Sequence, residues 1–155
     1  MDEESEVTIE QVREAAIRLL ARREHSVIEL IRKLRAKGWP EGLVHDAVEA
    51  LDGENLVSDE RFTEAFIHGR FSRGSGPMRI EAELHRKGVG DGVVEGLLDA
   101  RDAQWRELAR EVRRKRFGDP PPTEYRERAR QMRFLQGRGF THEQIRSALG
   151  DDEEY

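Results

Sequence analysis

The sequence predicts an all-α protein in which three tandem three-helix repeats form an elongated, curved, solenoid-like body. Three stretches, which begin at Leu34, Leu84 and Leu135, share one pattern and lie about 50 residues apart. In each, a helix ends in a basic residue and a glycine, an apolar residue follows, and the next helix begins at once. The composition agrees, because 38% charged and 6% aromatic residues suit helices with a thin core. Tandem units of this kind bury their faces partly against neighbours, which favours an extended body.

The start and stop signals divide the chain into three repeats between two acidic tails. We expect the repeats over residues 9–52, 53–101 and 102–149. The tails, residues 1–8 and 150–155, are rich in acids, and we expect them to be disordered.

Capping signals place the helices of the first repeat. Two residue pairs have the spacing of a capping box: Thr8 with Gln11, and Ser26 with Glu29. They predict one helix over about residues 9–23 and a second that ends at Lys37. Pro40 starts the third helix, which runs to about Leu51.

The second repeat opens with a helix for which Ser58 is the N-cap. Phe62, Phe66 and Gly69 follow at i, i+4 and i+7, which predicts a core-facing stripe of two aromatics and a closely packed glycine. Pro77 starts the second helix, and we expect the third over about residues 91–101.

The third repeat is expected to begin near Asp102 with a helix whose buried stripe contains Trp105. The sequence GDPPP at 118–122 stops this helix. A long basic helix over about residues 123–138 follows, and Thr141 with Gln144 caps a short last helix.

The middle of the chain resembles the central signature of the RecX family. The residues that carry the resemblance are Phe62, Phe66, Arg70, Gly74, Gly76, Arg79, Ile80, Glu83, Leu84 and Gly88. The similarity continues through Arg23–Trp39, Trp105–Pro122 and Arg133–Ile145, so that it covers nearly the whole chain. It implies a bacterial regulatory protein that lodges in the groove of the RecA filament on single-stranded DNA. There it would inhibit recombinase, ATPase and coprotease activities, and so modulate recombination and the SOS response.

Several classes of protein are disfavoured by what the sequence lacks. There is no cysteine, which excludes disulfides and thiolate zinc sites. No apolar run approaches the roughly 20 residues that span a bilayer, and the acidic N-terminus is unlike a signal peptide. We therefore expect a cytoplasmic protein without membrane association.

No converging catalytic site emerges from the sequence. The five histidines fall in different expected helices and lack a metal-ligand spacing such as HExxH. The glycines of RGSGP at 73–77 have no preceding strand and no following GKS or GKT, so they indicate an interhelical turn. We expect no enzymatic activity, no metal and no cofactor.

Positive charge is concentrated in the last third of the chain. The net charge is −5, yet residues 102–149 hold twelve Lys or Arg against seven Asp or Glu, which gives +5 there. Such asymmetry favours a polyanion or an acidic protein surface as partner, and a solvated helical face is the alternative interpretation. Arg106, Arg110 and Arg113 fall at i, i+4 and i+7 on one expected helix, and Arg126, Arg130 and Arg133 repeat this basic stripe on the next. Without interleaved aromatics, both stripes suit backbone phosphates or carboxylates and do not suit stacking on unpaired bases.

The candidate residues for contact with RecA or DNA come from the second and third repeats. They are Arg70, Arg73, Arg79, Arg86, Lys87, Arg106, Arg110, Arg113, Arg114, Lys115, Arg116, Arg126, Arg130 and Arg133. The resemblance makes the RecA filament the partner, allows a contact with single-stranded DNA, and is compatible with a monomer. A second hypothesis keeps the fold but makes the protein a general nucleic-acid binder without sequence specificity.

Overall fold

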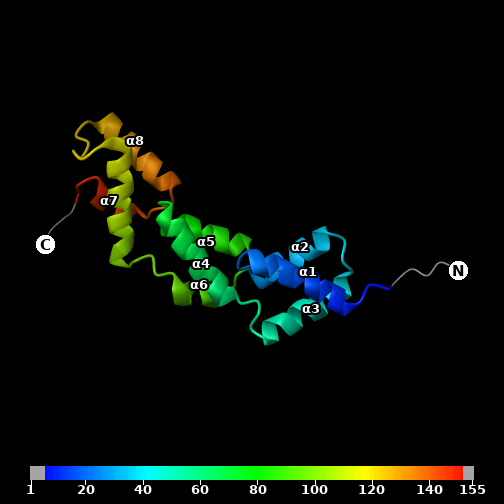
Figure 1. Ribbon diagram of the computed structural model, residues 1–155. Helices are drawn as coiled ribbons and strands as arrows, with labels where there is room; N and C mark the ends of the chain where they lie inside the picture. The colour runs from blue at the N-terminus through cyan, green and yellow to red at the C-terminus, as the bar shows by residue number, and fades with distance from the viewer. Residues whose placement is uncertain (1–5, 152–155) are drawn as a thin grey trace. The chain divides into compact units, whose positions relative to one another are not determined.

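The computed structural model describes residues 6–151, and this part of the chain consists of α-helices and connecting loops without a strand (Figure 1). The predicted all-α class is confirmed. The expected tails lie largely outside the described residues. The helices are α1 (Ile9–Arg22), α2 (Val27–Ala36), α3 (Glu41–Gly53), α4 (Asp59–Ser72), α5 (Pro77–Arg86), α6 (Asp91–Leu97), α7 (Ala103–Phe117), α8 (Tyr125–Gly137) and α9 (His142–Ala148).

The contacts divide the chain into two compact units. The first contains the described residues up to Ala65 together with His85–Val93, and the second contains Phe66–Leu84 together with the described residues from Val94 onward. The three boundaries between the units fall inside helices, one each in α4, α5 and α6.

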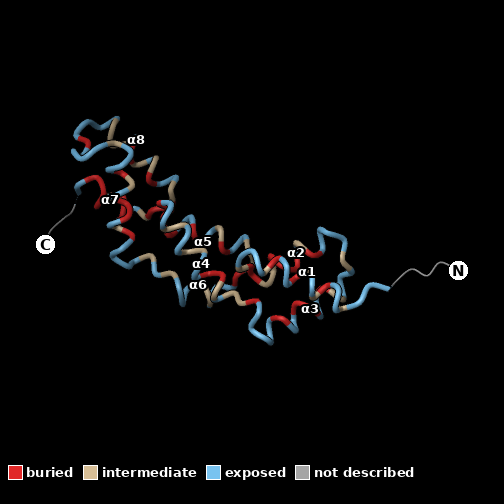
Figure 2. Tube along the Cα trace, viewed as in Figure 1, coloured by how far each residue is buried: buried red, intermediate tan, exposed pale blue. Residues whose placement is uncertain are grey.

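The first unit has its core between α1, α2 and α3. Fully buried side chains from all three helices meet there: Val12, Leu30, Leu34, Val44, Val48 and Leu51. Figure 2 shows these helices with buried positions on one side of each helix and exposed positions on the other. The pattern is that of amphipathic helices, which are held mainly by the burial of one apolar face.

The caps of α1 and α2 differ in one respect. Thr8 and Gln11 form a complete capping box, as the sequence predicts. Ser26 accepts a hydrogen bond from the backbone N–H of Glu29, but the Glu29 side chain does not return the bond. It binds Arg23 and Lys87 instead, so the second predicted capping box was wrong in this half.

Glycines end the helices that precede the three repeated turns. Gly38, Gly88 and Gly139 have φ angles of 93°, 79° and 96°. This left-handed conformation is favoured by glycine and closes a helix by returning backbone N–H groups to its last carbonyls. In the first turn, for example, the N–H of Trp39 donates to the carbonyl of Leu34 at 3.2 Å.

Two local expectations for the middle of the chain were wrong. Gly69 is exposed, and nothing lies within 4 Å of the position that a Cβ would take, so it is no close-packing residue. Helix α6 ends at Leu97 and not near Arg101. Beyond it, the carbonyl of Asp99 accepts a hydrogen bond from the Trp105 indole, and the carbonyl of Ala100 accepts one from Gln144. Side chains from α7 and α9 thus satisfy two carbonyls of the loop that follows α6.

The second unit is organised around α7, α8 and α9. Trp105 and Leu135 are buried with exposed fractions of 1% and 0%, and Ile145 and Leu149 are buried with them. Asp102 caps α7 and a complete Thr141–Gln144 capping box starts α9, both as predicted.

Candidate functional site

Two glycine-containing turns of the second unit meet backbone to backbone. The N–H of Gly76 donates to the carbonyl of Arg138 at 2.7 Å, and the N–H of Met78 donates to the carbonyl of Gly139 at 2.9 Å. A Cβ on Gly76 would lie 2.4 Å from the Gly139 carbonyl carbon, and a Cβ on Gly139 would lie 2.3 Å from that of Arg79. The contact therefore requires glycine on both sides, and it fixes the turn after α4 against the end of α8.

A cleft of about 530 Å³ opens beside this contact, between the end of α4, α7 and α8. Its apolar part comes from Phe71, Leu108, Val112 and Phe134. Its charged part comes from all three elements and contains one acid among four cations: Glu111, Arg73, Lys115, Arg116 and Arg138. The site therefore combines an apolar floor with an excess of positive charge.

The arginines of the cleft are held by contacts that leave their charge uncompensated. The guanidinium carbons of Arg116 and Arg138 lie 5.2 and 5.3 Å from the centre of the Phe134 ring, within the range of cation–π attraction. Arg138 also donates to the carbonyl of Arg73 at 3.1 Å across the turn at Gly74. Among the described residues, Arg73, Arg116 and Arg138 have no carboxylate partner, whereas Lys115 pairs with Glu111 at 3.0 Å.

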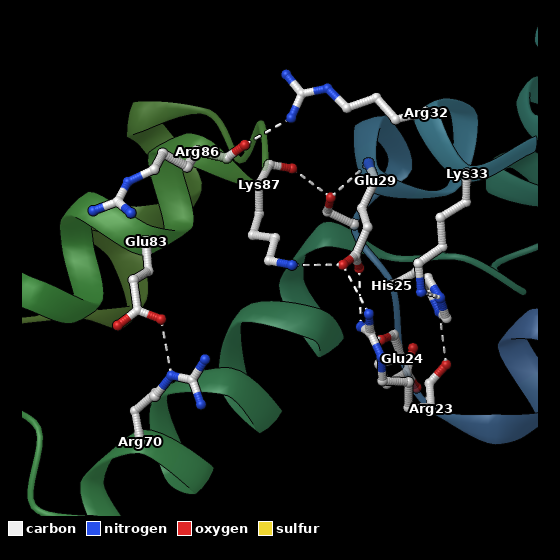
Figure 3. A network of polar contacts seen from close by, with 11 residues as sticks. Arg23, Glu24, His25, Glu29, Arg32, Lys33, Arg70, Glu83, Arg86 and Lys87 are labelled. Atoms are coloured by element: carbon white, nitrogen blue, oxygen red, sulfur yellow. Dashed lines mark hydrogen bonds and ion pairs between the residues drawn. The ribbon is translucent and has the colours of Figure 1, made fainter. Parts of the chain in front are cut away.

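The other candidate arginines of α4 and α5 share a carboxylate. Arg70 and Arg79 approach Glu83 at 2.9 and 3.3 Å, and Figure 3 shows the Arg70–Glu83 contact. Arg70 also lies over the ring of Phe66 at 4.6 Å. These two guanidinium groups are therefore engaged within the unit, and a partner would have to compete with Glu83.

The candidates Arg86 and Lys87 belong to a polar network of the first unit (Figure 3). Lys87 and Arg23 both bind the buried carboxylate of Glu29, at 2.9 and 2.8 Å. Burial by itself raises the pKa of Glu29, but the hydrogen bonds from Arg23 and Lys87 outweigh it and lower the pKa to about 2. The side chain of Lys87 thus serves the fold, whereas the exposed side chain of Arg86 has no carboxylate partner in the described part of the chain.

A buried histidine completes this network. His25 is 1% exposed and lies with Nε2 2.9 Å from the Lys33 ammonium and with Nδ1 3.0 Å from the carbonyl of Arg23. An ammonium only donates and a carbonyl only accepts, so the neutral ring carries its proton on Nδ1. Burial lowers the pKa of His25, and the charges of Arg23 and Lys33 act in the same direction.

The basic stripe predicted on α7 contains one structural residue. Arg113 is 4% exposed and donates to the carbonyls of Gly118 and Asp119, both at 2.9 Å, and to Gln131 at 3.2 Å. Its guanidinium thereby stabilises the loop that ends α7. The inclusion of Arg113 among the partner-contacting residues is corrected on this ground, since a helical spacing does not reveal a loop folded over the side chain.

The remaining basic residues of α7 are more accessible. Arg106 lies 3.9 Å from Glu143, Arg110 donates to the hydroxyl of Ser147 at 2.7 Å, and Arg114 lies 3.9 Å from Asp119. Of these three, Arg114 is the most open to a partner, because Arg106 and Arg110 are half-buried.

On α8 the three candidates are exposed. Arg130 pairs with Glu127 at 3.3 Å and lies 5.4 Å from the centre of the Phe117 ring. Arg126 and Arg133 have no carboxylate partner among the described residues. They add to the positive charge of this unit.

Sequence reasoning missed three residues of the cleft. In the sequence pattern Arg138 is only the basic residue before the terminal glycine, and neither the pattern nor the resemblance gives Phe134 a role in binding. Phe71 follows the family-signature residue Arg70 but was given no role. The basic stripes were expected to lack interleaved aromatics, and the fold places Phe71 and Phe134, which come from different repeats, in one cleft with Arg116.

The described residues show neither a metal-binding cluster nor a membrane-spanning helix. They contain no group of three or more His, Asp or Glu side chains placed to hold a metal ion. None of the described helices has both the length and the apolar character that crossing a bilayer requires.

Comparison with known proteins shows which family the chain resembles. Three family models match consecutive segments: the first, second and third three-helix domains of RecX match residues 13–51, 58–98 and 102–149. The chain is 48% identical over 145 residues to the regulatory protein RecX of Halorhodospira halophila, covering 94% of this chain and 90% of that protein. It is 46% identical over 137 residues to the regulatory protein RecX of Chromohalobacter salexigens, covering 88% and 90%.

A solved structure supports the fold independently. The crystal structure of RecX from Lactobacillus salivarius superposes with a TM-score of 0.77 at 20% identity, over 92% of this chain and 95% of that one. The predicted three three-helix repeats are thereby confirmed along with the resemblance. By its sequence and its succession of three-helix domains, the chain belongs to the RecX family.

Proposed function

We propose that this protein binds the RecA filament on single-stranded DNA and inhibits its recombinase, ATPase and coprotease activities. Membership in a family of regulatory proteins supports a regulatory role. The observation that carries the proposal is the group of arginines Arg73, Arg116 and Arg138 around the cleft, which have no carboxylate partner among the described residues. Such groups suit a partner that brings negative charge, either as carboxylates on a protein surface or as DNA phosphates.

The cleft geometry favours binding for an energetic reason. Contacts with Phe134 and with the Arg73 carbonyl restrict Arg116 and Arg138 before a partner arrives. Less side-chain entropy is then lost on binding, and fewer alternative internal ion pairs have to be broken. Arg70 and Arg79, which are engaged with Glu83, contribute less in this proposal.

Regulation here requires binding and no chemical step. Inhibition follows if the bound protein opposes the addition of protomers or the changes between protomers that accompany ATP hydrolysis. The relatives are named as regulatory proteins, in agreement with such a role.

Binding to assembled filaments tests the proposal. RecA filaments are formed on long single-stranded DNA with a non-hydrolysable ATP analogue, and co-sedimentation of this protein is measured. We expect retention with the filament, and we expect Arg116→Glu to reduce it about tenfold or more. The matched control is Arg18→Glu, an exposed charge of α1 outside the cleft. Absence of wild-type co-sedimentation, or equal losses in both variants, would contradict the proposal.

General nucleic-acid binding is the second candidate, favoured by the net charge of +5 over residues 102–149. Affinity would then arise from counterion release and fall steeply with salt. This candidate function predicts that the protein binds DNA with equal affinity in the presence and in the absence of RecA.

A further inference from the structure

The cleft between α4, α7 and α8 has the two components of a site for unpaired nucleotides. Single-stranded nucleic acids are bound by cations that contact the phosphates and by flat groups on which bases stack. The lining supplies both, with Phe71 and Phe134 next to Arg73, Lys115, Arg116 and Arg138.

The flat groups are held in fixed orientations. Phe71 packs edge-on against Trp105, with ring centres 5.2 Å apart, and Phe134 packs edge-on against Phe117 at 5.3 Å. The guanidinium groups of Arg116 and Arg138, placed by Phe134, add planes on which bases also stack. A base that enters would therefore meet preformed surfaces.

Size and charge agree with such a ligand. A volume of about 530 Å³ lies within the usual range for small-molecule sites, about 300–1,000 Å³. The single acid of the lining, Glu111, is paired with Lys115. The three arginines without a carboxylate partner thus leave the cleft positive toward a phosphodiester.

We propose that this cleft is a subsite for single-stranded DNA, which takes at least one unpaired base against its rings and guanidinium planes and contacts the flanking phosphates through Arg73, Arg116 and Arg138. The inference rests on the proposed function, which brings the protein next to single-stranded DNA in the filament. It adds that the cleft contacts the DNA and not an acidic segment of a protein. The carboxylates of an acidic peptide would pair with the arginines but would not stack on the rings and guanidinium planes.

Binding to a short oligonucleotide without RecA tests this inference separately from filament binding. Fluorescence anisotropy of a labelled 15-mer of deoxythymidine is measured at low salt with the full chain. We expect the double variant Arg73→Gln, Arg116→Gln to weaken binding about tenfold or more. The matched double variant Arg18→Gln, Arg22→Gln removes two charges from α1, outside the cleft, and should weaken it about threefold or less. Equal losses would overturn the subsite in favour of diffuse electrostatic binding.

Two further measurements address the base. An abasic oligonucleotide of equal length should bind about fivefold more weakly or worse, and Phe134→Leu, which keeps an apolar side chain, should remove most of this difference. Photocrosslinking with 5-iododeoxyuridine should label Phe71 or Phe134. Equal affinity for both oligonucleotides, crosslinks only outside the cleft, or displacement of the 15-mer by an acidic peptide at equal charge concentration would each overturn the inference. If the wild type fails to bind the 15-mer yet sediments with RecA filaments, the subsite is wrong while the proposed function stands.

Discussion

Glu29 and Lys87 lie 58 positions apart in the sequence and form an ion pair of 2.9 Å. The Glu29 side chain is 7% exposed, and Arg23 binds its carboxylate from the other side. The Ser26 hydroxyl donates to the carbonyl of Lys87, and Arg32 donates to that of Arg86. Side chains of Ser26, Glu29 and Arg32, together with the side chain of Lys87, therefore hold α2 against the turn after α5.

Replacing Glu29 by glutamine should destabilise the protein. The variant loses the buried carboxylate that binds both Arg23 and Lys87. The loss is partly offset because these two side chains are half-exposed and regain hydration. We expect the free energy of unfolding in urea to fall by about 1–3 kcal/mol. Glu14→Gln, at an exposed pair with Arg18, should change it by less than about 0.5 kcal/mol. Equal effects of the two variants would contradict this role of Glu29.

The same carboxylate predicts an acid-sensitive contribution to stability. Folding lowers the pKa of Glu29 from its ordinary 4.5 to about 2, so its contribution is present above pH 4.5 and is lost as the pH falls toward 2. Urea unfolding at a series of pH values should show the difference between wild type and Glu29→Gln shrinking over this interval. A difference that stays constant from pH 5 to pH 2.5 would refute the assignment.

His25 predicts a second pH dependence, in a higher range. Burial lowers its pKa below the ordinary 6.5, so the unfolded chain takes up a proton before the folded one does. The stability that depends on the neutral ring is present above pH 6.5 and declines as the pH falls below it. The free energy of unfolding of His25→Gln, which has no titrating ring, should lack this decline. An NMR titration in which the His25 ring protonates above pH 6.5 would disprove the prediction.

The two glycines Gly76 and Gly69 should respond to alanine in opposite ways. Gly76→Ala places a methyl group against the Gly139 backbone and should cost about 2 kcal/mol or more. Gly69→Ala meets nothing within 4 Å inside α4 and should stabilise the protein by about 0.5–1 kcal/mol. Thermal or urea unfolding of the two variants provides the comparison, and the turn-to-turn contact is disproved if Gly76→Ala is neutral.

Arg113 and Arg114 are neighbours with different expected roles. Arg113→Gln should cost about 2–4 kcal/mol of stability, because three loop carbonyls and Gln131 lose a charged donor. Arg114→Gln should leave stability within about 0.5 kcal/mol, since its contact with Asp119 is long and exposed. A stable Arg113→Gln variant that no longer binds RecA filaments would restore Arg113 to the contact surface.

The elements that could be predicted depend on residues close together in the sequence. The Thr8–Gln11 and Thr141–Gln144 capping boxes act over three residues, and Pro77 sets its own helix start. Gly38 and the equivalent glycines adopt the left-handed conformation that ends a helix. Repetition of these local signals was sufficient for the all-α class and its succession of repeats.

What could not be predicted depends on contacts between distant residues. The Glu29 side chain binds Lys87 and does not complete its own helix cap. After α6 ends at Leu97, Trp105 and Gln144 donate to carbonyls of the loop that follows. A stripe on a helical wheel places Arg113 beside its neighbours but says nothing of the loop that covers it. The cleft is likewise absent from any single repeat, since Phe71 and Phe134 come from different repeats and line it together only in the fold.

The central claim is that the protein acts on the RecA filament as an assembly. The most direct measurement is the single-stranded-DNA-dependent ATPase rate of the cognate RecA, titrated with this protein well below one copy per RecA protomer. We predict a clear fall in the rate at these ratios, because each bound copy would affect many protomers. A rate that stays constant until the protein saturates the DNA itself would contradict the claim and favour simple competition for nucleic acid.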